Sequence, residues 1–179
     1  MRGFVPLAFL AASSAVPAGA GELTPAWEAQ AGLGISRGVG EPQLFGHALD
    51  LDLSMARRFG GSRRAFSIAA FSTYRRILNA GDQASFWYLD AGLRPAFWVT
   101  PRVSLWVDGG VSLRRIVAPG GTSNMVTGLV VGSGVDVAVF SRPAWELRAA
   151  LGFRATAHLD TDDFWVGDLS ALVKVTRCW

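Results

Sequence analysis

Apolar and polar side chains alternate along eight segments of this chain. Side chains of a strand point to opposite faces with a period of two, so each segment predicts a strand with one apolar and one polar face. Clusters of Gly, Pro, Asn, Asp and Arg separate the segments, as is typical of turns. The expected strands span approximately 27–36, 44–57, 64–75, 84–99, 103–115, 125–140, 145–158 and 164–179.

Charge is confined to one face of these strands. Apart from Arg57, Arg115 and Arg177, near the ends of three segments, the odd-numbered positions in seven of the segments carry no Asp, Glu, Arg or Lys. The third segment, RRAFSIAAFSTYRR, leaves its orientation open, because Phe66 and Ile68 share one face while Phe71 lies on the other. The charged row, with Arg75 of the third segment, comprises Glu28, Asp50, Asp52, Arg75, Asp90, Arg94, Asp108, Arg114, Asp136, Glu146, Arg148, Arg154, Asp168 and Lys174.

Alternation alone does not say which face meets water. A soluble lipocalin-like barrel turns its apolar row inward, whereas a membrane barrel turns it outward. Glycines favour the second arrangement, because they lie on the charged face at positions that include Gly92, Gly110, Gly132 and Gly134. Exposed strand positions gain nothing from glycine, but a narrow eight-stranded interior needs small residues beside large ones. We therefore predict that the charged face is enclosed.

An enclosed charge must have a partner. In VSLWVDGGVSLRR, residues 103–115, Asp108 would point into a narrow interior, where burying a charge is costly unless it is paired or hydrogen-bonded. The acids and bases of the charged row are therefore predicted to form a lumenal salt-bridge network that fills the barrel. The alternative, a set of unrelated surface charges, requires the soluble barrel.

The links between segments and the start of the chain indicate a membrane location. TPR and SRPA are short links, whereas the first, third and fifth links are longer and rich in Gly, Pro or Asn. This predicts an all-β fold, an eight-stranded antiparallel up-and-down transmembrane β-barrel over residues 21–179. MRGFVPLAFLAASSAVPAGA reads as a signal peptide cleaved near Ala20. Pro95, inside the fourth segment, has no N–H for the ladder and predicts a bulge.

The C-terminal stretch LSALVKVTRCW resembles the last strand of small outer-membrane barrels of Gram-negative bacteria, the OmpA and OmpX type. The resemblance covers the whole predicted mature length and rests on pattern. It implies an outer-membrane location and a partner, the barrel-assembly machinery, which would read Val173, Val175 and Trp179 as an assembly signal. Trp179 stands where Phe is commoner, and Arg177 stands where an apolar or aromatic residue is usual.

Few residues of the sequence suggest a catalytic site. Some barrels of this kind modify lipids, and His158 precedes Asp160, Asp162 and Asp163, but no Ser follows two places later as in the lipid A deacylase family. The acids lack the spacing of a calcium loop. We assign no catalytic residue, metal or cofactor, and expect a structural or surface-interaction role with an unspecified loop ligand. A lipid-modifying enzyme and a narrow transport pathway are the alternatives.

The rim with short turns is basic. It gathers Arg57, Arg58, Arg63, Arg64, Arg102, Arg142 and Arg177. These could be solubilising turn charges, or they could bind the anionic headgroups of outer-membrane lipids. The formal net charge of the whole chain is only +3, so the composition does not indicate a nucleic-acid partner.

Overall fold

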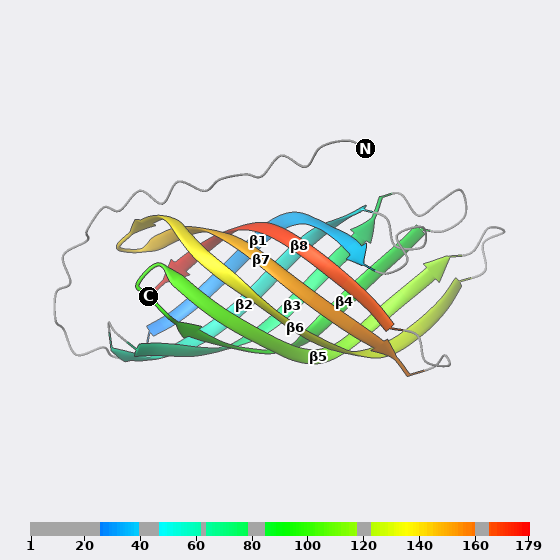
Figure 1. Cartoon of the computed structure of the whole chain (residues 1–179), viewed down its shortest axis with the longest axis horizontal. Coiled ribbons are helices and arrows are strands. Elements are labelled where there is room, and N and C mark those ends of the chain that lie inside the picture. The colour runs from blue at the N-terminus through cyan, green and yellow to red at the C-terminus, as the bar shows by residue number, and fades with distance from the viewer. Residues whose placement is uncertain (1–25, 40–46, 62–63, 79–84, 118–122, 160–164) are drawn as a thin grey trace.

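The computed structural model describes residues 26–39, 47–61, 64–78, 85–117, 123–159 and 165–179; the predicted signal peptide lies outside this part. Each strand pairs antiparallel with the next, and the last pairs with the first, so the sheet closes into an eight-stranded barrel, as predicted (Figure 1). No helix in the described ranges is long and apolar enough to cross a membrane. The strands are β1 (Ala26–Val39), β2 (His47–Gly61), β3 (Arg64–Ile77), β4 (Ser85–Trp98), β5 (Val103–Val117), β6 (Ser123–Arg142), β7 (Trp145–His158) and β8 (Trp165–Cys178).

The pairing registers decide which row of each strand faces the interior. Directly opposite residues of neighbouring strands lie on the same face of a sheet. Asp50 of β2 lies opposite Arg75 of β3, so the interior row, which is even in β2, is odd in β3. This settles the strand that the sequence left open: Phe66 and Ile68 face outward, and Phe71 faces inward.

The barrel has two unlike rims. β1 begins and β8 ends at the rim on the left of Figure 1, which we call the short-turn rim. The links on this side are residues 62–63, 99–102 and 143–144. The opposite side, the loop rim, carries residues 40–46, 78–84, 118–122 and 159–164. The predicted alternation of short and longer links is therefore confirmed.

The predicted bulge at Pro95 is wrong. Pairing of β4 with β5 is interrupted at Arg94 and Pro95 but resumes at Ala96 in the same register, and pairing with β3 is continuous through Pro95. The missing N–H therefore removes local ladder contact without inserting a residue. A register shift occurs instead in the pairing of β6 with β7, between Ala138 and Phe140.

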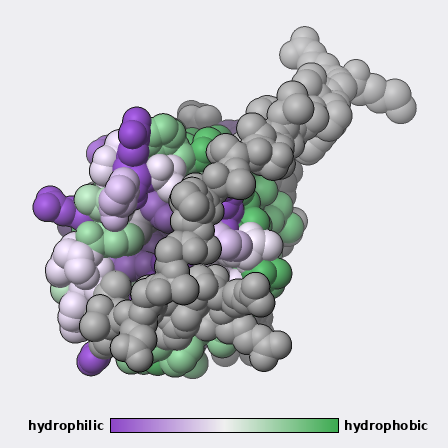
Figure 2. All heavy atoms as spheres, turned by 90° about the vertical axis from the view of Figure 1, so that its left-hand side faces the viewer, coloured by the Kyte–Doolittle hydropathy of each residue, from purple (hydrophilic) through white to green (hydrophobic). Residues whose placement is uncertain are grey.

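Burial is inverted relative to a water-soluble protein. Asp50, Asp108 and Asp136 are all buried inside the barrel, whereas Leu33 is 68% exposed and Val111 is 60% exposed on the outside. Viewed from the short-turn rim, hydrophobic residues gather along the flank of the molecule (Figure 2). A continuous apolar exterior of this kind is costly in water and is suited to a hydrocarbon surrounding.

Candidate functional site

The residues of the predicted charge network all lie on the inward-facing row. They are buried, except that the side chain of Glu146, at the short-turn rim, is 20% exposed. They come from all eight strands, so the network ties together segments far apart in the sequence. Their contacts fall into a central group and one group toward each rim.

Two aspartates and two arginines form the central group. Arg94 donates to both carboxylate oxygens of Asp52, with Nη1–Oδ1 at 3.0 Å and Nη2–Oδ2 at 2.8 Å. Arg154 donates to Asp108, with Nη2–Oδ2 at 2.9 Å and Nε–Oδ2 at 3.1 Å. Arg94 also reaches Asp108 at 3.3 Å, and the hydroxyl of Thr73 donates to Asp52 at 2.9 Å. The paired geometry compensates the desolvation of these charges.

Aromatic rings enclose the central guanidinium groups. The Cζ of Arg94 lies 4.7 Å from the ring centroid of Phe71 and 4.9 Å from that of Trp106. Trp106 donates from Nε1 to Asp136 at 2.9 Å, and Lys174 donates to the same carboxylate at 3.2 Å. Cation–π contacts and ion pairs thus share the same cations, and the rings fill the space between them.

Toward the loop rim, Arg75 bridges two acids. It donates from Nε to Asp50 at 2.9 Å and from Nη1 to Asp168. The Cζ of Arg114 lies 3.8 Å from the ring centroid of Tyr88. Asp50 also accepts a hydrogen bond of 2.9 Å from Ser36. This group therefore links β1, β2, β3 and β8, and beside it Arg114 of β5 stacks on Tyr88 of β4.

Toward the short-turn rim, the structure adds a cation to the predicted network. Arg58 pairs with Glu28 at 3.3 Å and stacks over Trp98 with its Cζ 4.2 Å from the ring centroid. From the sequence we predicted Arg58 as a rim charge, although its even position continues the inward row of β2. Arg148 pairs with Glu146 at 2.6 Å in the same group.

Glycine makes room for the large interior groups. A Cβ at Gly134 would lie 2.3 Å from Cζ2 of Trp106 and 2.4 Å from the carbonyl oxygen of Leu151. A Cβ at Gly132 would lie 2.3 Å from Oδ1 of Asp108. These contacts explain why glycine occupies the charged face near the middle of β6.

Substitution of Gly134 by alanine is expected to destabilise the folded barrel by about 1–3 kcal/mol, because the added methyl overpacks a site where backbone and a ring are both too close. Urea unfolding followed by tryptophan fluorescence measures the change. Gly109→Ala is the matched control, since its Cβ would meet only a carbonyl oxygen at 3.9 Å. Equal stability of the two variants would contradict the packing explanation.

The other predicted features are placed as follows. Val173, Val175 and Trp179 face outward, and Trp179 exchanges two backbone hydrogen bonds of 3.0 Å with Trp27, which continues the closure of β8 on β1. His158 is buried at the loop-rim end of β7, while Asp160, Asp162 and Asp163 lie outside the described residues. The described residues contain no group of three or more His, Cys, Asp or Glu that could hold a metal ion.

Comparison with known proteins gives structural matches only. No protein-family model matches the sequence, and no curated protein matches it. Ail, the attachment invasion locus protein of Yersinia pestis, is similar with a TM-score of 0.62 at 14% identity, covering 88% of this chain and 100% of that chain. The N-terminal barrel domain of Pseudomonas aeruginosa OprF gives 0.55 at 12% identity, with 86% and 97% covered. Neisserial surface protein A gives 0.52 at 17% identity, with 86% and 96% covered.

These similarities agree with the closed antiparallel topology. They confirm the fold that the resemblance to the OmpA and OmpX type implied. At such low sequence identity these similarities show the fold of the chain and do not show its role. The chain has the fold of the small eight-stranded outer-membrane β-barrels.

Proposed function

We propose that this chain is an integral protein of the Gram-negative outer membrane, with an interior closed by ion pairs and a structural or surface-interaction role. The observation that carries the proposal is the inverted burial: an apolar exterior surrounds paired charges. A β-barrel satisfies its backbone groups between strands, so such an exterior is compatible with hydrocarbon. In this proposal the signal peptide is removed near Ala20, and Val173, Val175 and Trp179 are read by the barrel-assembly machinery.

The interior supports a plug better than a channel. Arg94 contacts acids of β2 and β5, and Arg154 of β7 reaches the same two acids across the barrel. Phe71 and Trp106 fill space beside these cations. An open water-filled pathway would require these groups to separate and leave charges unpaired, which is costly in a narrow interior.

Fractionation tests the membrane location. The chain is expected in the outer-membrane fraction and, because a folded barrel resists unfolding by detergent, to migrate differently on a gel with and without boiling. Recovery in the soluble periplasmic fraction would contradict the proposal. The same fraction, analysed by mass spectrometry, should contain a chain that begins close to residue 21.

Planar-bilayer recordings test the plug. The purified barrel is expected to give no steady conductance, because ion pairs and rings occupy its cross-section. Steady single-channel steps would favour the transport pathway instead. A lipid A profile that changes with expression of the chain and reverts with His158→Ala would favour the lipid-modifying enzyme.

A further inference from the structure

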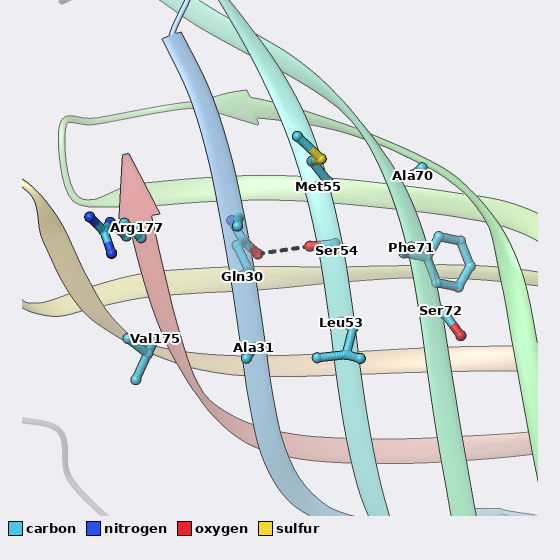
Figure 3. A pocket seen from close by; sticks show the side chains of 11 residues that line it. Gln30, Ala31, Leu53, Ser54, Met55, Ala70, Phe71, Ser72, Val175 and Arg177 are labelled. Carbon is cyan, nitrogen blue, oxygen red and sulfur yellow. Dashed lines mark hydrogen bonds between the residues drawn. The ribbon is translucent and has the colours of Figure 1, made fainter. Parts of the chain in front are cut away.

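The outer surface over β8, β1, β2 and β3 contains a hollow of about 690 Å³ near the short-turn rim (Figure 3). Two rows of directly opposite residues cross it. The first row runs Arg177, Ala29, Met55, Ala70, and the second runs Val175, Ala31, Leu53, Ser72. The hollow exists because short side chains, at Ala29, Ala31, Ala70 and Ser72, alternate with longer ones. Arg177 of β8 lies at one edge of it, with its side chain on the side of β8 away from β1 (Figure 3).

The rim next to the hollow is cationic and aromatic. Trp145 lies opposite Arg177, and Arg142 lies opposite Trp145. On the other side, Arg57 lies opposite Trp27, with its Cζ 5.9 Å from the ring centroid. All of these side chains are exposed on the exterior. Amphipathic rings and long basic side chains with apolar stems are suited to the boundary between hydrocarbon and headgroups.

Among the described residues, no Asp or Glu on the exterior balances these arginines. Every Asp and Glu of the described ranges lies on an inward-facing row. The described cations at the short-turn rim therefore face outward with no described Asp or Glu on the same surface. Anionic groups carried by the surrounding membrane are the complementary charge.

We propose that the hollow is a binding site for an anionic phospholipid, with an acyl chain lying over Ala29, Ala31 and Ala70 and the phosphate against Arg177. The apolar floor accepts the chain, and the adjacent arginine selects the charged headgroup over a zwitterionic one. This inference rests on the proposed membrane location.

A second copy of the chain fits the hollow less well. Two copies in one membrane share an orientation, so a two-fold axis along the membrane normal would bring their equivalent surfaces together. An axis through the centre of the hollow would place the Arg177 edge of one copy against the β3 edge of the other, where Ala70 and Ser72 lie. Arg177 would then be covered by neutral groups without an opposite charge, which is unfavourable, whereas a phosphate is attracted.

The test is lipid retention by the folded chain. Protein already shown to be heat-modifiable on a gel is placed in nanodiscs with equal amounts of phosphatidylglycerol and phosphatidylethanolamine of the same acyl chains, then released and weighed by native mass spectrometry. Phosphatidylglycerol is expected to be retained about fivefold more than phosphatidylethanolamine, because its headgroup has a net negative charge that attracts Arg177, whereas the ammonium group of phosphatidylethanolamine offsets the charge of its phosphate. Arg177→Gln should abolish this preference.

Variants that fill the hollow test the contact with the acyl chain separately from the contact with the headgroup. Ala31→Phe should reduce retention of both lipids, and Ala70→Phe, from β3, should do the same, so the result does not depend on one variant folding. The controls are Arg115→Gln, an outward cation at the loop rim, and Ala155→Phe, on the outward row of β7. Retention unchanged in Arg177→Gln and both filling variants would overturn the site while leaving the membrane location intact. A dimer mass that the filling variants abolish would show that a second copy occupies the hollow, which also overturns it.

Discussion

Replacement of Asp52 by alanine is expected to destabilise the folded barrel by about 3–5 kcal/mol, one of the two largest effects that the structure predicts. Asp52 accepts two hydrogen bonds from Arg94 and one from Thr73, and Arg154 approaches it at 3.5 Å. Loss of the carboxylate leaves one negative charge fewer for two buried guanidinium groups. Urea unfolding of the barrel in lipid vesicles, read by the fraction that keeps its folded gel mobility, measures the change.

Two variants show whether burial of the unpaired cations is the cause. Asp52→Asn keeps the size and one acceptor, so it should lie between wild type and Asp52→Ala. Glu146→Ala removes an acid at the rim, where the Glu146 side chain is 20% exposed, and leaves one buried cation, Arg148, rather than two, so it should cost less than Asp52→Ala. Similar losses of stability for Asp52→Ala and Glu146→Ala would show that the central ion pairs stabilise the barrel no more than the pair at the rim.

Substitution of Val131 by lysine is expected to destabilise the barrel in a bilayer by about 2–4 kcal/mol. Val131 lies near the middle of β6 and is 56% exposed on the exterior. At that depth an ammonium group is held in hydrocarbon, away from water and headgroups. The same urea titration in vesicles measures the effect.

The same substitution near the end of a strand is the control for Val131→Lys. Val39, at the loop-rim end of β1, is 47% exposed and faces outward as well. Val39→Lys should cost at most about 1 kcal/mol, because the cation reaches the interface. If Val131→Lys changed stability by no more than about 0.5 kcal/mol, as for an ordinary surface substitution in water, the exterior would not be in hydrocarbon.

Most of the fold could be predicted from the alternation of side chains with a period of two. Because successive side chains of a strand must point to opposite faces, spacing alone placed Asp50, Asp108 and Asp136 each on the charged face of its own strand. Glycines such as Gly134 then indicated a crowded face, and the structure shows the crowding as the ring of Trp106 against that position. These inferences depend on local geometry, which the sequence contains.

Features that depend on neighbouring strands were harder to predict from the sequence. Pro95 removes a donor, but whether the chain responds with a bulge depends on the pairing with β3, which stays in register. Arg58 adjoins the outward Arg57 in sequence and was read as a rim charge. Its contacts with Glu28 and Trp98 arise from strands β1 and β4, which sequence spacing does not relate to β2.

The strands, and the separation of an apolar face from a charged one, could be predicted from the sequence, because both follow from the two-residue repeat of an extended chain. The orientation of β3 and the partner of each charge became known only from the folded barrel. Pairs such as Arg154 with Asp108 join residues on β7 and β5, and their meeting depends on the registers around the closed barrel. Each register is fixed by packing across strands, so no single segment encodes it.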